Sequence, residues 1–374
     1  MLSNPAVLGT ADASGCWAWA GVRLSAEGRI TATQRFPDLS WDERRRRVDA
    51  EEAAWLAAQW EPPAPGERFE VRFATGPNAD KVRAALLFRA HAAGEAEVRE
   101  RALARLARAA DPNGALPPHV GAAAIEAETE LRTWLEYPKQ VGGVVELRKH
   151  LSVGPIGRGG SSLRAAVCHG FFAEGAAWDA WWRRFAALRF RAVLCVGFDA
   201  YDAANPVLQG HLQRRTLELE DLAVAQTPSP LNPNPVPAEP AARLAAPGYR
   251  RAMSSYRGRC FLVRVALVSE QPVPPALGEA LARTISSVEG AVVPVPVAAQ
   301  EAGLVLREHR GLGAPWLPLT YQQHLHPVRI DAVDQVLHSL ADVTEASAAL
   351  SLPVHWPGMP AVFDAVGSEL RDDD

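Results

Sequence analysis

Lysine is almost missing from this sequence. Lysine and arginine together number 39 in 374 residues, and the only lysines are Lys81, Lys139 and Lys149. Such a bias toward arginine is typical of a GC-rich genome and does not by itself indicate a phosphate-binding surface. An excess of positive charge is missing too, because the formal net charge is −4. This charge gives no electrostatic reason to expect nucleic acid as the main partner.

Cysteine is scarce, and long apolar runs are absent. The four cysteines, Cys16, Cys168, Cys195 and Cys260, are widely spaced, and the last three lie in apolar, strand-like runs. This pattern predicts buried free thiols in a reducing compartment. The first residues lack the basic start and apolar core of a signal peptide, and no window is apolar enough to span a bilayer. We therefore expect a cytoplasmic protein that reaches any membrane complex through partners.

Length and composition predict two or three packed units. The chain is long for one domain, and an apolar fraction of 48% can fill a core. The patterns divide it into an N-terminal α/β subdomain (1–150), a ferredoxin-like subdomain (151–310) and a helical C-terminal segment with a polar tail (311–374). A proline-rich insertion at 227–240 interrupts the second unit and is expected to form an exposed loop.

The first unit alternates strands and helices. Residues 15–23 are typical of a strand, and Ser40 with Glu43 forms a capping-box pattern for a helix that ends near Trp60. Apolar and charged residues then alternate as in a half-buried strand. One face of this strand comprises Phe69, Val71 and Phe73, and the other comprises Arg68, Glu70 and Arg72.

The second unit repeats the mixture. Strands are predicted at 163–171, 190–198, 259–269 and 291–297. Trp178, Trp181, Trp182 and Phe185 have the helical spacing of a core-facing stripe, which we favour over a stacking platform for bases. The order strand–helix–strand, insertion, strand–helix–strand predicts an α+β fold. We expect ferredoxin-like (split βαβ) layers, with mixed antiparallel sheets and helices on one face.

One glycine-rich segment imitates a phosphate-binding loop. GPIGRGGS begins at Gly154, and its weak candidate ligands are Gly154, Arg158, Gly159 and Ser161. Gly160 stands where the loop needs a lysine for the β- and γ-phosphates, and the following residues resemble a strand where the motif needs a helix. The pattern therefore favours a flexible connector over a nucleotide site.

Metal-binding residue types occur in two groups. One group is His324, His326 and Asp331, and the other is Cys168, His169 and Cys195. The first lacks a third and fourth ligand at the usual local spacing. In the second, Cys168 and His169 are adjacent on a strand and point to opposite faces, so they cannot act on each other. We expect no metal site and no catalytic nucleophile.

Two charged features have structural explanations. Asp199 ends an apolar strand and could hold magnesium in a motor, but without a lysine loop we expect it to cap a turn. The basic run Arg44–Arg47 is flanked by acids at helical spacing, which predicts a solvated, self-neutralising helix face.

Three motifs resemble one protein family. The helix after the first strand opens with LSWDER (39–44), similar to a pattern L-S-x-x-E-R, and a proline- and glycine-rich turn precedes the charged strand at 61–73. Near the end, Asp342 and Glu345 begin an alanine-rich helix that stops at the leucine–proline pair 352–353. In this order, the motifs resemble the N-terminal, non-motor region of the conjugation (type IV secretion) ATPases of the HerA–FtsK superfamily.

The resemblance implies a front-half fold that builds a ring or docks a motor onto a membrane complex. It carries over no catalytic residue, because the family's nucleotide loop and magnesium-binding acid would lie beyond Asp374. We expect a non-catalytic, motor-less adaptor or assembly subunit without a cofactor, whose partner is a P-loop ATPase or copies of itself. Two alternatives are a divergent nucleotide-binding protein that uses Gly154–Ser162 and a nucleic-acid-binding module on a ferredoxin-like sheet.

Overall fold

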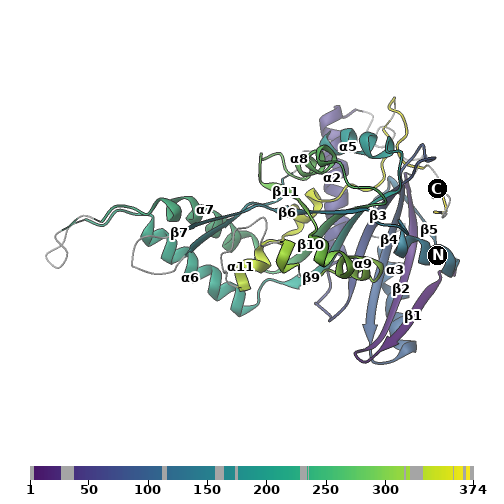
Figure 1. Ribbon diagram of the computed structural model, residues 1–374, viewed down its shortest axis with the longest axis horizontal. Helices are drawn as coiled ribbons and strands as arrows, with labels where there is room; N and C mark the ends of the chain where they lie inside the picture. The colour runs from purple at the N-terminus through teal and green to yellow at the C-terminus, as the bar shows by residue number, and fades with distance from the viewer. Residues whose placement is uncertain are drawn as a thin grey trace.

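A computed structural model describes most of the chain, namely residues 4–26, 38–111, 116–155, 164–172, 176–227, 234, 236–315, 317–320, 332–356, 358–364 and 368–370. The molecule is a mixed α/β structure with one large antiparallel sheet, helices against the sheet and an arm that projects from one end (Figure 1). Among the described residues, no helix has the length and apolar character needed to cross a membrane.

In the described part of the chain, the main sheet contains ten strands, and the pairings between them are antiparallel. Its strands are β1 (Val7–Asp12), β2 (Gly15–Ala26), β3 (Arg68–Thr75), β4 (Arg83–Ala92), β5 (Val120–Ala124), β6 (Gly143–Lys149), β9 (Ala192–Asp202), β10 (Arg259–Ser269), β11 (Val292–Pro296) and β12 (Leu340–Ala341). They lie in the order β1-β2-β4-β3-β9-β10-β6-β11, with β5 beside β2 and β12 beside β10. The prolines of β11 are tolerated because this strand ends the order, as its sequence predicted.

The helices of the main body are α2 (Trp41–Ala58), α3 (Glu95–Ala109), α4 (Glu128–Glu136), α5 (Ala176–Ala186), α8 (Pro275–Ile285), α9 (Ala302–Arg310), α11 (Ala332–Leu337) and α12 (Val343–Ala348), with a 3₁₀ turn, η1 (Ala299–Glu301), before α9. The predicted capping box at the start of α2 is confirmed. The Ser40 hydroxyl accepts from the Glu43 backbone N–H, and the Glu43 carboxylate accepts from the Ser40 N–H at 2.9 Å.

Two successive segments have the same connectivity. The first runs β2, α2, β3, β4, α3, β5. The second runs β6, α5, β9, β10, α8, β11, apart from two insertions, one between β6 and α5 and one between β9 and β10. Their strand orders across the sheet also correspond, as β5-β2-β4-β3 and β11-β6-β10-β9. The boundary predicted at residue 150 falls just after β6. The strand predicted at 163–171 is β8 (Arg164–Cys168), which pairs with β7 (Leu151–Pro155) outside the main sheet.

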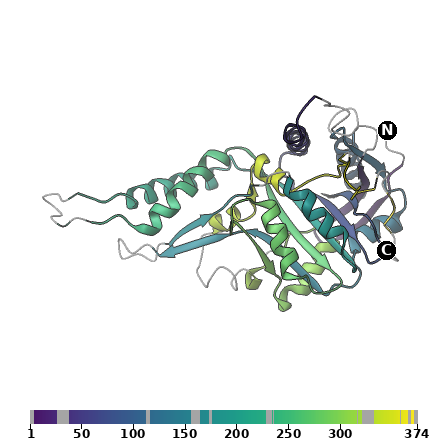
Figure 2. The same cartoon turned by 90° about the horizontal axis from the view of Figure 1, so that it is seen from above.

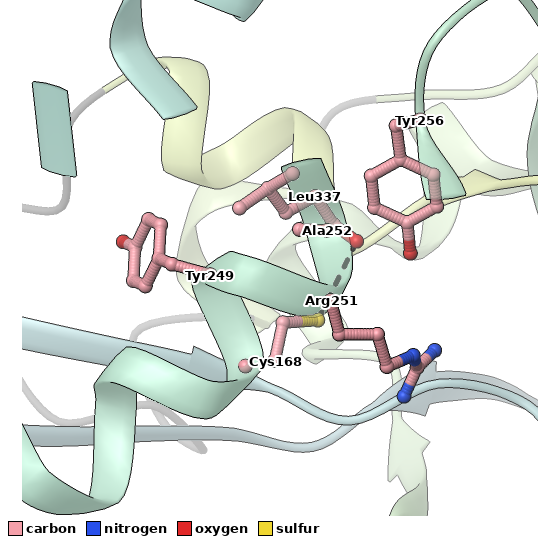
Figure 3. A pocket seen from close by; sticks show the side chains of 7 residues that line it. Cys168, Tyr249, Arg251, Ala252, Tyr256 and Leu337 are labelled. Carbon is pink, nitrogen blue, oxygen red and sulfur yellow. Dashed lines mark hydrogen bonds between the residues drawn. The ribbon is translucent and has the colours of Figure 1, made fainter. Parts of the chain in front are cut away.

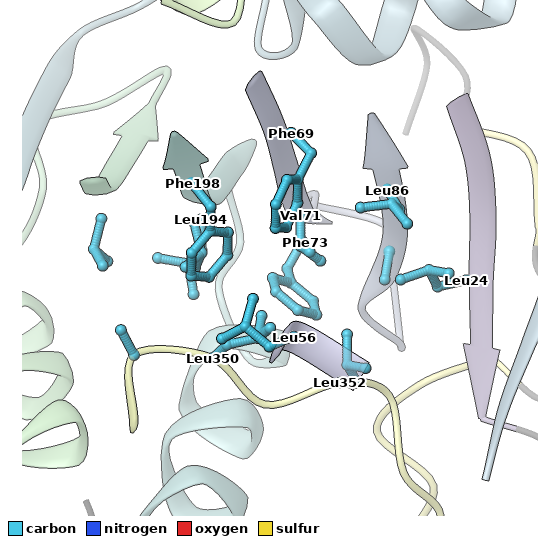
Figure 4. Close-up of a cluster of buried hydrophobic side chains, with 14 of the residues drawn as sticks. Leu24, Leu56, Phe69, Val71, Phe73, Leu86, Leu194, Phe198, Leu350 and Leu352 are labelled. Carbon is cyan, nitrogen blue, oxygen red and sulfur yellow. The ribbon is translucent and has the colours of Figure 1, made fainter. Parts of the chain in front are cut away.

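The two segments join where β3 pairs with β9. Phe69 lies opposite Phe198 in this pairing, and their rings stack with centroids 5.0 Å apart. These rings belong to the largest apolar core, to which the helices α2, α3, α5, α8 and α12 contribute (Figure 4). The tryptophan stripe of α5 lies in this core, with Trp181 and Trp182 each 1% exposed, so its predicted packing role is confirmed.

Helices also cover the face of the sheet that points away from this largest core. The prediction of helices on one face is therefore wrong. A second core on that face includes Leu87 and Val193 of the sheet, Leu131 and Trp134 of α4, and Leu312 just after α9. This face also carries charged side chains, and the ends of α4 and α9 supply backbone acceptors for them. Both faces of the central strands are therefore buried.

An arm extends away from the sheet and from the labelled chain ends (Figures 1 and 2). It consists of the antiparallel helices α6 (Pro206–Leu222) and α7 (Pro240–Ser255), with the ribbon of β7 and β8 alongside. Asn205 caps α6, since its side chain accepts from the Val207 N–H at 2.8 Å, as predicted. The helices are held together by a small apolar core and by the Arg250–Glu220 ion pair at 2.6 Å. Part of the predicted proline-rich insertion (residues 228–233 and 235) lies outside the described residues.

Candidate functional site

The charged face of β3 is buried, contrary to the half-buried strand predicted from its alternation. Arg68, Glu70 and Arg72 are at most 2% exposed. Arg72 Nε donates to Glu70 Oε1 at 2.7 Å, and Arg68 pairs with Asp199 of β9. Burial would raise the pKa of Glu70, but Arg72 and Arg68 outweigh it and hold this pKa at about 2. Glu70 is therefore ionised inside the protein.

Buried arginines also satisfy the ends of two helices. Arg72 Nη1 donates to the carbonyls of Trp134 and Leu135 at 2.6 and 3.0 Å, and Arg72 Nη2 donates to the carbonyl of His309. These carbonyls lie in the last turns of α4 and α9, where no intrahelical donor remains and a cation is favourable. Arg264 Nη1 likewise donates to the Gly313 carbonyl at 3.0 Å. We assign this layer a structural role.

Within this layer, Cys195 and His309 lie side by side, although no sequence pattern indicated that they would be neighbours. Cys195 Sγ lies 3.7 Å from His309 Nδ1, and His309 Nε2 lies 3.0 Å from the Tyr137 carbonyl. A carbonyl can only accept, so Nε2 carries the proton and Nδ1 faces the thiol. Burial raises the pKa of Cys195 to about 12, while burial and Arg72 lower the pKa of His309 to about 3. Both groups stay neutral at physiological pH, so they do not form an activated nucleophile.

A second charged cluster lies where the arm meets the sheet. Lys149 is 1% exposed, and its ammonium pairs with Glu345 of α12 and donates to the Tyr256 hydroxyl at 3.1 Å. The Tyr256 hydroxyl in turn donates to Glu345 at 2.9 Å, and Arg251 of α7 pairs with the same carboxylate. Adding a Cβ to Gly170 would clash with both Arg251 and Glu345. This cluster fastens β6, α7 and α12 to one another.

Cys168 lies next to this cluster in a small pocket (Figure 3). Its thiol donates to the Leu337 carbonyl at 3.4 Å, and Tyr249, Arg251 and Tyr256 also line the space. The pocket volume is about 20 Å³, which suits a single water molecule and is too small for a substrate. We therefore interpret Cys168 as a packing residue at the base of the arm.

Two larger cavities have different electrostatics. One, of about 200 Å³, is lined by paired charges. There Arg105 meets Glu61, Arg68 meets Asp199, and Arg89 donates to two backbone carbonyls. The other, of about 210 Å³, lies between α2, α5 and α12 and is called here the α2–α12 cavity. Among the described residues that line it, the charged ones are Asp49 and Glu52, both carboxylates.

The candidate phosphate loop is described only at its start. Gly154 lies in β7, whereas Arg158, Gly159 and Ser161 lie outside the described residues. The next described element is the strand β8, where a phosphate loop would lead into a helix.

The metal candidates are not assembled in the described part of the chain. His324, His326 and Asp331 lie outside it. Cys168 and Cys195 belong to different apolar clusters, and the described residues include no group of three His, Cys, Asp or Glu side chains that could hold a metal ion. All four cysteines are free, with Cys195 and Cys260 buried as predicted and Cys16 and Cys168 partly exposed.

Asp199 and the basic run also differ from their predicted roles. Asp199 pairs with Arg68 across strands and does not simply cap a turn. Within Arg44–Arg47, Arg45 is only 5% exposed, contacts Asp179 of α5 and lies 4.5 Å from the Trp356 ring centroid. The basic run is therefore a solvated face only in part.

The arm carries an unusual share of exposed apolar side chains. Eight large apolar residues are exposed in the described part of the chain, and four of them lie on or directly after the arm helices. These four are Val207 (67% exposed), Leu217 (61%), Val224 (64%) and Leu244 (75%). The two helices contain only 17 and 16 residues, so this concentration on the arm marks it as the strongest candidate interaction surface.

No protein-family model matches the chain, and no curated protein matches it significantly.

Proposed function

We propose that this protein is a non-catalytic adaptor or assembly subunit that binds another protein through the α6–α7 arm. The observation that carries the proposal is the exposure of Leu217 and Leu244, at 61% and 75%, on a projecting pair of helices. Single exposed apolar residues are common on protein surfaces, but half of all those in the described chain lie on this arm. Burial of such side chains is a main source of affinity in protein–protein contacts.

The resemblance in the sequence suggests the kind of partner. A front-half region of a conjugation ATPase works beside a P-loop motor, so we propose a separate P-loop ATPase, or copies of this chain, as the partner. We also infer that both segments of the sheet are ferredoxin-like, because each has the strand order four-one-three-two of a split βαβ unit.

Two structural observations speak against the alternatives. A phosphate loop needs a helix after its glycines, and the next described element here is the strand β8. Recognition of RNA by a ferredoxin-like sheet needs an open face for stacked bases, and apolar cores with helices cover both faces of the central strands.

Native mass spectrometry tests the proposal on the chain co-expressed with the products of neighbouring genes. We expect a defined complex with a motor protein or a defined homo-oligomer, which the double variant Leu217→Glu/Leu244→Glu disrupts. Val288→Glu is the matched control, because Val288 is also exposed (48%) but lies on the body. A strictly monomeric wild-type protein, or equal loss of the complex in the control, would refute an arm-mediated assembly.

A further inference from the structure

The outer face of α6 carries a continuous stripe of exposed residues. The inner face of this helix, with Leu208, Leu212 and Leu219, belongs to the apolar core of the arm. The exposed residues recur at intervals that alternate between three and four, which is the spacing of a seam between two packed helices. They are Val207, Gly210, Arg214, Leu217, Asp221 and, just after the helix, Val224. Because these residues are exposed, the stripe can receive a second helix.

The two charges of this stripe are the unused charges of the arm. Arg214 and Asp221 form no ion pair or side-chain hydrogen bond with another described residue. The other arginine and glutamate side chains of α6 and α7 have partners. They pair as Arg215 with Glu218, Arg250 with Glu220 and Arg251 with Glu345, and Arg243 donates to the Ala223 carbonyl. One cation and one anion therefore remain on the outer face of α6, on either side of Leu217.

The order of these two charges is complementary to itself. Arg214 lies three residues before Leu217, and Asp221 lies four residues after it. In an antiparallel pair of α6 helices, a two-fold axis beside Leu217 places Arg214 of each copy near Asp221 of the other, as an isologous contact requires. A parallel pair would place like charges beside each other, which is unfavourable. The charges therefore select the antiparallel arrangement.

The apolar members of the stripe fit the same arrangement. Leu217, which is 61% exposed, would meet its counterpart at the two-fold axis, so that both side chains leave water. Val224 lies as far after Leu217 as Gly210 lies before it, so each Val224 would pack over Gly210 of the other copy. A Cβ added to Gly210 would meet no atom within 4 Å, which leaves room for this side chain.

The shape of the molecule permits this pairing. With 17 residues, α6 is about 25 Å long. The arm extends away from the sheet (Figure 2), so two antiparallel arms leave the two bodies at opposite ends of the pair. One seam of this length is small beside the roughly 1,200–2,000 Å² that a standard interface buries. We therefore expect a dissociating dimer with a Kd of roughly 1–100 μM.

We propose that the outer face of α6 binds the same face of a second copy of this chain, antiparallel and with Arg214 opposite Asp221. This inference rests on the proposed function, because it names the partner of the same arm. Of the two partners proposed above, the stripe favours a second copy, since contact with a motor protein would not require a self-complementary order of charges.

Sedimentation velocity of the purified full chain over a roughly hundredfold range of concentration tests the dimer. We expect a monomer that gives way to a dimer as the concentration rises. Arg214→Asp and Asp221→Arg should each weaken the dimer about tenfold or more, because each change turns two attractions into two repulsions. Arg99→Asp, on the exposed face of α3, makes the same change in charge as Arg214→Asp and should have no effect.

Restoring the order of the charges provides a second readout. The double variant Arg214→Asp/Asp221→Arg should dimerise like the wild type, and an equimolar mixture of the two single variants should form a heterodimer. A purely structural effect of either substitution on the arm would not be reversed in this way. Circular dichroism of each variant checks that the helices remain folded.

Three results would overturn the dimer. They are a wild-type chain that stays monomeric at every concentration, equal weakening by Arg99→Asp, and single variants that neither the mixture nor the double variant rescues. A monomeric wild type whose complex with a motor protein is disrupted by Leu217→Glu/Leu244→Glu would refute the dimer and leave the proposed function standing. A monomeric wild type without any such complex would refute both.

Discussion

At the scale of single residues, buried charges here serve the backbone. Arg72 bonds to Glu70 and to the last carbonyls of two helices, so one side chain satisfies acceptors from three elements. Such a side chain is costly to bury alone and favourable only with all its partners present. The charged layer is therefore a single structural unit whose members cannot be removed individually without large effects.

Replacing Glu70 should destabilise the protein strongly. Glu70→Gln leaves Arg72 buried without its carboxylate, although Arg68 keeps Asp199 as its partner, and we expect a cost of ~3–5 kcal/mol. Because the pKa of Glu70 is lowered to about 2, its contribution is present at neutral pH and is lost as pH falls through the acid range toward 2. Urea denaturation measures the effect, and Glu100→Gln, on the exposed face of α3, is the control. Equal denaturation midpoints for the two variants would contradict the structural role of the layer.

Replacing Asp49 should stabilise the protein, in contrast to replacing Glu70. Its folded pKa of about 6 lies above its unfolded value, so the carboxyl favours folding only while protonated, and the ionised form weakens the fold at neutral pH. Asp49→Asn should raise the free energy of unfolding at pH 7.5 by ~1–2 kcal/mol, after allowance for partial solvent screening. The gain should shrink as pH falls through 6 toward 4. Thermal denaturation at several pH values measures it, and a gain independent of pH would contradict the assigned pKa.

At the scale of elements, the sequence pattern of each segment predicted whether it forms a helix or a strand. The pattern predicted less well which residues pack around that element. The alternation around residue 70 correctly indicated a strand, and the capping box correctly placed the start of α2. The sequence could not show that Arg72 is buried, because its acceptors come from residues 134, 135 and 309. The same holds for the α2–α12 cavity, whose walls come from four separated stretches of chain.

Replacing two glycines by alanine should change the stability of the protein in opposite directions. On β9, Gly197 has no room for a Cβ, which would meet the guanidinium of Arg68. Gly197→Ala should displace Arg68 from Asp199 and destabilise the protein by ~1–3 kcal/mol. On α6, Gly210 has open space and is exposed, so Gly210→Ala should stabilise the arm helix by ~0.5–1 kcal/mol. Chemical denaturation of both variants checks this, and a neutral Gly197→Ala would contradict the packing of Arg68.

At the scale of the whole molecule, two segments of the same connectivity share one sheet. The pairing of β3 with β9 and the stacked rings of Phe69 and Phe198 make the joint part of the main core. The sequence showed no repeat of fixed period, because the correspondence lies in strand order and not in residue identity. The arm helices α6 and α7 are inserted between β9 and β10 and leave the pairing of these two strands uninterrupted.

The shared core predicts cooperative unfolding of both segments. Loss of either segment would expose the apolar side chains at the β3–β9 joint, so neither should remain folded alone. Hydrogen exchange followed by mass spectrometry in increasing denaturant should show Val71 of β3 and Val196 of β9 losing protection together. Loss of protection in one segment at clearly lower denaturant would show that the segments are independent domains.

The proposed function requires that the arm be the interaction surface. A photo-reactive amino acid placed at Leu217, at Leu244 or at the body position Val288 tests it most directly, when the chain is co-expressed with the partner that native mass spectrometry identifies. We expect cross-links to that partner, or to a second copy of the chain, from Leu217 or Leu244 and none from Val288. Cross-links from Val288 alone, or from no position while the complex remains intact, would contradict it.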